Sequence, residues 1–64
     1  MTETAALRDE LFDTREAAEI LRQSEAALRQ LRYLGKGPRY VKHGRRVLYR
    51  ASDIREYLEA NVHG

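Results

Sequence analysis

The sequence lacks cysteine, and it has only two histidines, His43 and His63. Without cysteine the chain forms no disulfide and offers no thiolate ligand to a metal ion. No other ligand stands at metal-site spacing from either histidine, so we expect neither a bound metal nor a cofactor. The sequence also offers no carboxylate pair and no nucleophile beside a base. We therefore do not expect an enzyme.

Long apolar segments are missing as well. No apolar run approaches the roughly 20 residues that a helix needs to cross a bilayer, and no apolar signal-peptide core follows Met1. We therefore expect a soluble, cytoplasmic protein that does not bind membranes. Its 64 residues suffice for one domain. A chain this short buries only about 60% of its unfolded surface, which leaves no room for a large substrate pocket.

Acidic residues are absent from the middle of the chain, between residues 26 and 52. Three bases and seven acids precede this segment, and one base and three acids follow it, giving net charges of −4 and −2 on its two sides. The segment itself carries +8, so the formal net charge of +2 hides a cationic block. The members of this block are Arg29, Arg32, Lys36, Arg39, Lys42, Arg45, Arg46 and Arg50. Such a block is typical of a polyanion-binding domain, and a merely solvated basic surface is the alternative.

The first part of the chain predicts a polar segment followed by a helix. Residues 1–10 are polar, and we expect them to fray or to form a loose helical turn. An amphipathic pattern then predicts a helix over residues 15–21. Asp13 or Thr14 caps this helix, and Asp13 with Glu16 has the spacing of a capping box.

A second helix follows after a tight turn. Ser24 is a strong N-cap residue, and the helix is predicted to run from residue 25 to residue 33 or 34. Leu28 and Leu31 lie three residues apart, so both face the interior. Only two residues separate the first helix from Ser24. Two short helices joined in this way form a helix-turn-helix unit.

Glycine and proline end the second helix and introduce a hairpin. Gly35 suits the left-handed position after a helix, and Pro38 prevents the helix from continuing. Two strands are predicted over residues 39–42 and 46–50, joined by a short loop over residues 43–45. Because an isolated hairpin is unstable in water, these strands must pack on the helices.

The last part of the chain completes the predicted domain. Tyr40 and Tyr49 alternate with charged neighbours, so we expect core positions for them rather than base-stacking platforms. Ser52 is predicted to cap a helix over residues 53–60. This helix packs through an apolar stripe of Ile54, Tyr57 and Leu58. The resulting fold is α+β, mainly α: a winged helix-turn-helix over residues 11–61, with three helices and a two-stranded β-hairpin wing.

In a helix-turn-helix unit the second helix enters the DNA major groove with its N-terminal part first. The DNA-binding candidates on and beside this helix are Ser24, Glu25, Ala26, Arg29, Gln30, Arg32 and Tyr33. Arg29 suits a guanine and Gln30 an adenine. Glu25 either accepts from a cytosine amino group or only favours the helix N-terminus. Arg32 either meets a phosphate or packs its stem on the hairpin, and Ser24 caps the helix with or without contacting a phosphate.

The hairpin supplies the candidate wing. Arg45, at its tip, is the candidate for entering a minor groove, which A·T-rich sequence makes narrow and electronegative. The other candidates on the wing and its approach, expected to meet the DNA backbone, are Lys36, Arg39, Lys42, His43 and Arg46. His43 is not expected to bind a metal or to act as a general base, because no partner accompanies it.

A set of residues spread along the chain matches, in identity and order, the pattern of a known family. They are Thr14, Glu16-Ala17-Ala18, Leu21, Ser24, Leu28, Gly35-Lys36-Gly37-Pro38, Val41-Lys42, Gly44-Arg45, Val47, Tyr49, Asp53 and Leu58. This set resembles the small excisionase-type and AlpA-like winged-helix domains of the MerR superfamily. The chain departs from that pattern at Arg22 and Gln23, where glycine and an apolar residue are common. It departs also at Leu31 and Tyr57, where tryptophans are common.

The resemblance implies a sequence-specific binder of double-stranded DNA. Its likeness to excisionases implies a recombination directionality factor, which bends attachment-site DNA and directs an integrase toward excision. The integrase is a tyrosine or serine recombinase, and copies of the protein are expected to bind side by side on DNA. A transcriptional regulator with the same domain is the alternative. A protein-interaction adaptor, whose basic face meets an acidic partner, is the third hypothesis.

Overall fold

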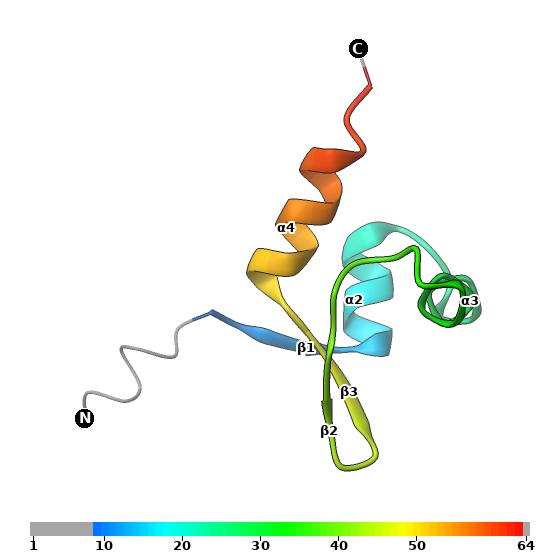
Figure 1. The fold of residues 1–64 in the computed structure, drawn as a ribbon, viewed down its shortest axis with the longest axis vertical. Helices are drawn as coiled ribbons and strands as arrows, with labels where there is room; N and C mark the ends of the chain where they lie inside the picture. The colour runs from blue at the N-terminus through cyan, green and yellow to red at the C-terminus, as the bar shows by residue number, and fades with distance from the viewer. Residues whose placement is uncertain (1–8, 64) are drawn as a thin grey trace.

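The computed structural model describes residues 9–63, which form three helices and a three-stranded sheet (Figure 1). In chain order the elements are β1 (Leu11–Asp13), α2 (Thr14–Leu21), α3 (Glu25–Leu34), β2 (Val41–His43), β3 (Arg46–Arg50) and α4 (Ala51–Ala60). The predicted winged helix-turn-helix architecture is confirmed. Of the predicted polar segment 1–10, only the last two residues lie within the described part of the chain.

The sheet contains a strand that the sequence analysis did not predict. β3 pairs antiparallel with β1 on one side and with β2 on the other, so the strand order is β1-β3-β2. Phe12 lies opposite Tyr49 in this register, and both side chains contribute to the core. The predicted two-stranded hairpin is present as β2 and β3, and β1 adds a third strand of only three residues. That length is too short to show an alternating pattern.

The hairpin of β2 and β3 differs from its prediction at one end. β3 has its predicted bounds, whereas β2 begins at Val41 rather than at residue 39. Tyr40 therefore precedes the strand and is 44% exposed, so its predicted core position is wrong. Its ring still lies near that of Tyr49, with centroids 6.2 Å apart and planes inclined by 53°. Tyr49 is fully buried, as predicted.

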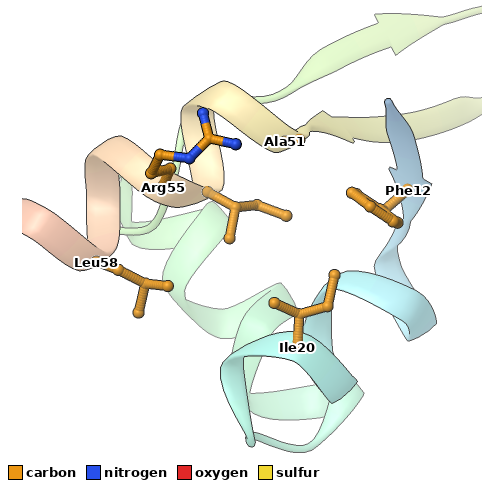
Figure 2. A pocket seen from close by; sticks show the side chains of 6 residues that line it. Phe12, Ile20, Ala51, Arg55 and Leu58 are labelled. Atoms are coloured by element: carbon orange, nitrogen blue, oxygen red, sulfur yellow. The ribbon is translucent and has the colours of Figure 1, made fainter. Parts of the chain in front are cut away.

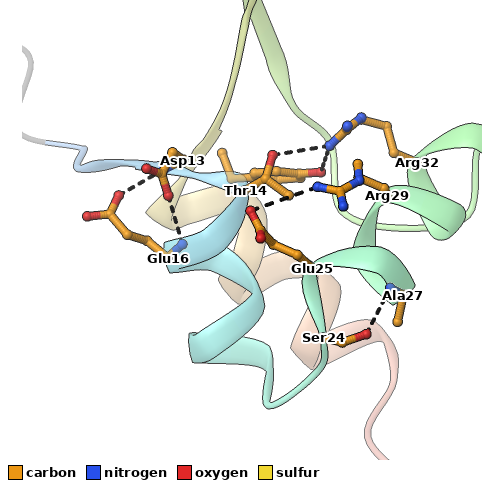
Figure 3. A network of polar contacts seen from close by, with 9 residues as sticks. Asp13, Thr14, Glu16, Ser24, Glu25, Ala27, Arg29 and Arg32 are labelled. Carbon is orange, nitrogen blue, oxygen red and sulfur yellow. Dashed lines mark hydrogen bonds and ion pairs between the residues drawn. The ribbon is translucent and has the colours of Figure 1, made fainter.

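Side-chain caps hold both helices of the helix-turn-helix unit (Figure 3). The carboxylate of Asp13 accepts a hydrogen bond from the N–H of Glu16, whose own carboxylate accepts from the N–H of Asp13. The hydroxyl of Ser24 accepts from the N–H of Ala27 at 3.0 Å. The predicted capping box and the Ser24 cap are thus confirmed. Between the helices, Arg22 has a φ of 59°, the left-handed conformation that glycine usually adopts.

Helix α4 begins two residues earlier than predicted, and Ser52 is not its N-cap. Arg50 occupies the capping position without a capping hydrogen bond, and its Nε lies 2.6 Å from Oδ2 of Asp53. Ser52 lies in the first turn, where its N–H and its hydroxyl donate to the carboxylate of Asp9 at 3.0 and 2.5 Å. The Ser52 prediction failed because β3 continues directly into α4, which moves the helix start upstream.

The core lies between the sheet and the three helices. Its buried apolar members are Ala17, Ala18, Leu28, Tyr49 and Ile54, with Phe12, Leu21, Leu31 and Val47 packed against them. The two alanines of α2 are small, which lets α3 approach closely. Leu28 faces this contact and is fully buried, as its spacing predicted. The core therefore fixes α3 against α2 and leaves the opposite side of α3 exposed.

An open apolar depression lies between α2 and α4 (Figure 2). Its lining consists of Phe12, Ile20, Ala51, Ile54, Arg55 and Leu58. Leu58 was predicted to face the core, but it is 47% exposed, so that prediction is wrong. Figure 1 shows α4 extending beyond the sheet.

Candidate nucleic-acid interface

Helix α3 divides sharply into a core side and an exposed side. Leu28 is buried, and Leu31 and Arg32 are half-buried beside it. The exposed residues of the helix are Glu25, Ala26, Ala27, Arg29, Gln30, Tyr33 and Leu34. Tyr33 is 85% exposed and takes no part in the core. Apart from Arg32, the residues predicted to read DNA therefore lie on one accessible surface, with Ser24 at its N-terminal end.

Glu25 and Arg29 form an ion pair on this exposed surface (Figure 3). Oε2 of Glu25 and Nη1 of Arg29 are 3.8 Å apart, and the two residues are one helical turn apart. Both side chains are about half exposed, so the pair is weak and readily exchanged. The guanidinium of Arg29 can therefore leave the carboxylate for a base or a phosphate.

Arg32 instead turns toward the sheet and the start of α2. Its Nη1 donates to the hydroxyl of Tyr49 at 2.8 Å and to Oγ1 of Thr14 at 3.3 Å. Its guanidinium carbon lies 5.8 Å from the ring centroid of Tyr40. Contact with the hairpin, one of the two alternatives predicted for Arg32, is present in the free protein. Tyr49 and Thr14 were missed as partners, although the hydroxyl of a buried tyrosine usually finds a donor or acceptor.

The wing projects from the body of the domain as a narrow two-stranded loop (Figure 1). Its candidate DNA-binding residues, Lys42, His43, Arg45 and Arg46, are all exposed. Lys42 lies opposite Val47 in the sheet register, so it shares the helix-covered face of the sheet. His43 lies opposite Arg46 on the other face. Arg45 stands at the tip, where Gly44 takes a φ of 62°.

The connection between α3 and the wing carries the remaining candidates. Gly35 ends α3 with a φ of 70°, as predicted, and Pro38 is buried. Lys36 and Arg39, on either side of that proline, are both exposed. The buried proline thus anchors a short segment that presents two cations between the helix and the wing.

Five of the eight cations in the central block make neither an ion pair nor a side-chain hydrogen bond within residues 9–63. They are Lys36, Arg39, Lys42, Arg45 and Arg46. Of the others, Arg29 pairs with Glu25 and Arg32 donates to two hydroxyls. A short hydrogen bond to Asp53 raises the pKa of Arg50. The cations without an internal side-chain partner therefore belong to the wing and its approach, where they are available to an external polyanion.

The family model described as a helix-turn-helix domain matches residues 11–62. The match begins at the first residue of β1 and ends beyond α4, so it includes the sheet and all three helices. The chain belongs to the helix-turn-helix domain family. No curated protein matches the sequence.

Membership in this family indicates that the domain that carries α3 and the wing serves DNA binding. This helix-turn-helix domain is a small sequence-specific DNA-binding domain, and α3 is the second helix of its helix-turn-helix unit. Across residues 9–63, no cluster of three or more His, Cys, Asp or Glu side chains could hold a metal ion. Within the same range no helix has the length and apolar character to span a bilayer.

Proposed function

We propose that this helix-turn-helix domain is an excisionase, a recombination directionality factor that directs an integrase toward excision. The observation that carries its DNA-binding part is the exposed side of α3 together with five unpaired cations on the wing and its approach. The excisionase part is supported by the resemblance described above. Its most specific element is Lys36-Gly37-Pro38 leading into the Gly44-Arg45 hairpin and then an Asp53-led helix.

The recognition helix enters a major groove, where base edges carry a full donor and acceptor code. Arg29 bonds a guanine and Gln30 an adenine, since both side chains are exposed on the same side of α3. Glu25 and Ala26 lie at the N-terminal end of the helix, which enters first. Tyr33 extends the same surface toward the C-terminal end.

The wing lies along the DNA backbone beside that groove. Lys42 and Arg46 meet phosphates, and Arg45 at the tip enters the adjacent minor groove. Lys36 and Arg39 meet phosphates between the two, with His43 nearby on the wing. Ser24 and the N-terminal amides of α3 hold a further phosphate. If roughly four to six phosphates are neutralised, log affinity against log salt should slope about −4 to −5.

As an excisionase the protein bends attachment-site DNA in the bacterial cytoplasm, and copies bind side by side along it. Contact between neighbouring copies is favoured by charge, because two acidic flanks of net −4 and −2 surround a +8 block. The integrase, a tyrosine or serine recombinase, is the protein partner. A transcriptional regulator would use the same domain and the same DNA contacts, so the two roles differ in the site that is bound and in the need for an integrase.

An excision assay tests the proposal. Where a recombinase gene lies beside the gene of this protein, the two proteins are combined with a plasmid that carries the matching attachment sites. We expect excision to rise when the protein is added, and to fall back with a folded Arg29→Ala/Arg45→Ala variant. Unchanged excision together with altered transcription from a neighbouring promoter would favour the regulator. Absence of salt-dependent duplex binding would favour the adaptor.

A further inference from the structure

We propose that Arg32 is a positioning residue, which fixes the wing relative to α3 so that helix and wing reach adjacent grooves of one duplex. This inference rests on the proposed DNA-binding function and adds a determinant to it. It assigns Arg32 to the internal geometry of the interface rather than to a phosphate.

One guanidinium nitrogen joins three elements of the fold (Figure 3). Arg32 belongs to the last turn of α3, Thr14 is the first residue of α2, and Tyr49 lies in β3. Nη1 of Arg32 donates to Tyr49 at 2.8 Å and to Thr14 at 3.3 Å. The contact therefore spans the recognition helix, the helix packed against it and the central strand of the sheet.

The same side chain also contacts the segment that enters the wing. The guanidinium carbon of Arg32 lies 5.8 Å from the ring centroid of Tyr40, immediately before β2. Tyr40 in turn lies against Tyr49, with ring centroids 6.2 Å apart. Arg32 thus meets aromatic residues from both sides of the hairpin. Fixing these two residues fixes the hairpin relative to α3.

The outer part of the wing has the weakest support: β3 is held by its pairing with β1 and by Val47 and Tyr49 in the core, whereas β2 pairs only with β3. β2 has three residues, all exposed, and a two-stranded hairpin is not stable alone in water. The covalent connection from α3 is anchored at the buried Pro38, and Tyr40 follows it immediately before β2. Tyr49 anchors the base of the hairpin in the core, and Arg32 adds the link from that base to α3.

Arginine is chemically suited to this role, and lysine is not. The planar guanidinium presents several donors in fixed directions and stacks on aromatic rings, so it bridges two hydroxyls and a ring at once. A lysine ammonium meets a phosphate as a point charge, but it does not reproduce that arrangement. Arg32→Lys therefore separates positioning from phosphate contact, because it keeps the charge and loses the planar group that lies near the Tyr40 ring while Nη1 bonds the two hydroxyls.

The test is a set of double-mutant cycles with the wing tip. Affinity for the preferred duplex is measured with and without Arg45→Ala in wild type, Arg32→Lys, Arg32→Met and Tyr49→Phe. In wild type, loss of Arg45 should weaken binding roughly tenfold. In all three variant backgrounds the same loss should fall below about threefold, because a wing that is not positioned contributes little. Tyr49→Phe removes only the hydroxyl oxygen that accepts from Arg32. It therefore keeps the test usable should Arg32→Met fail to fold.

A second readout uses the free protein. Backbone order parameters of the hairpin, residues 41–50, should drop from about 0.85 toward 0.6 in Arg32→Met and Tyr49→Phe, with α2 unchanged. If Arg45→Ala weakened DNA binding by the same factor in wild type and in all three variants, Arg32 would have no positioning role. A phosphate contact by Arg32 would overturn that role as well. In that case Arg32→Lys would bind DNA with wild-type affinity, and Arg32→Met would make the plot of log affinity against log salt shallower by about one. A wild type that binds no duplex would overturn the proposed function itself, and this inference with it.

Discussion

Asp9 holds the first turn of α4 through Ser52, 43 residues further along the chain. The hydroxyl of Ser52 donates to Oδ2 of Asp9 at 2.5 Å, and its backbone N–H donates to Oδ1 at 3.0 Å. Both bonds favour the charged carboxylate, and together they hold the pKa of Asp9 below its ordinary 3.8, the hydroxyl contributing most. The contact thus ties the segment before β1 to the helix that follows β3.

Ser52→Ala should raise the pKa of Asp9 toward 3.8, because it removes the larger of the two causes. The folded pKa lies below the unfolded value, so the contact stabilises the protein fully above pH 3.8. That contribution is lost as the pH falls through the folded pKa. NMR titration of the Asp9 carboxyl and acid unfolding of both proteins measure the effect. Ser24→Ala is the control: it should destabilise α3 and leave the Asp9 titration where it was.

Leu28→Ala should lower the free energy of unfolding by about 2–5 kcal/mol, because it leaves a cavity under the recognition helix. Leu28 is fully buried among the core residues of α2, β3 and α4. In so small a domain this change could unfold the protein at ordinary temperature. Leu34→Ala, on the same helix but 51% exposed, should change stability by less than about 0.5 kcal/mol. Denaturant melts of the two variants with equal midpoints would be incompatible with the described core.

Local signals predicted much of this fold. The Asp13 capping box, the Ser24 cap and the Gly35 helix end each depend on residues within a few positions of one another. The features that were missed depend on distant partners. β1 becomes a strand only because β3 pairs with it, and Ser52 is engaged by a carboxylate 43 residues away. No local pattern encodes either contact.

The candidate site shows the same division. The spacing of Leu28 and Leu31 was enough to place most other residues of α3 outside, and these are exposed, but Arg32, placed outside with them, is half-buried. The charge count could not tell which cations are engaged within the fold. Arg32 and Arg50 belong to the same acid-free block as Arg45, yet two of the three are held by internal partners. That distinction requires the packing of the hairpin on α3.

Arg22→Gly should stabilise the protein by roughly 0.5–1 kcal/mol. Arg22 has a φ of 59°, and the left-handed conformation costs a residue with a Cβ about 1–2 kcal/mol. Glycine removes this strain, and the greater freedom of its unfolded chain offsets part of the gain. Gln23→Gly is the matched control, since Gln23 has no positive φ, and it should be destabilising. Thermal melts that rank the two variants in the opposite order would contradict the expected relief of strain.

Arg29→Ala and Lys42→Ala should weaken DNA binding in different ways. We expect the loss of Arg29 to cost about 1–3 kcal/mol on the preferred site and to flatten discrimination at one base position. The loss of Lys42 should weaken all sequences by a similar factor, because a phosphate contact carries no sequence information. Competition binding against single-base variants of the site distinguishes these outcomes. Relative base preferences that survive Arg29→Ala would show that another residue reads the groove.

Arg45→Ala tests the wing. Arg45 stands at the exposed tip of the hairpin, next to the left-handed Gly44, and has no ion pair within the described residues. If its guanidinium neutralises a phosphate, the substitution should make the plot of log affinity against log salt shallower by about one. If it enters the minor groove, the substitution should also weaken the preference for A·T-rich sequence beside the major-groove site.

The fold should survive this change, because Val47 and Tyr49 anchor the hairpin in the core while Arg45 lies outside it. Circular dichroism checks that condition, and titrations at several salt concentrations on duplexes with A·T-rich and G·C-rich flanks supply the slope and the preference. Arg55→Ala is the matched control, since it removes one arginine beside the apolar depression of α2 and α4, away from the wing. It should shift neither quantity. A folded Arg45→Ala protein that matched wild type in affinity, slope and flanking preference would reduce the hairpin to scaffolding, and α3 alone would then have to account for DNA binding.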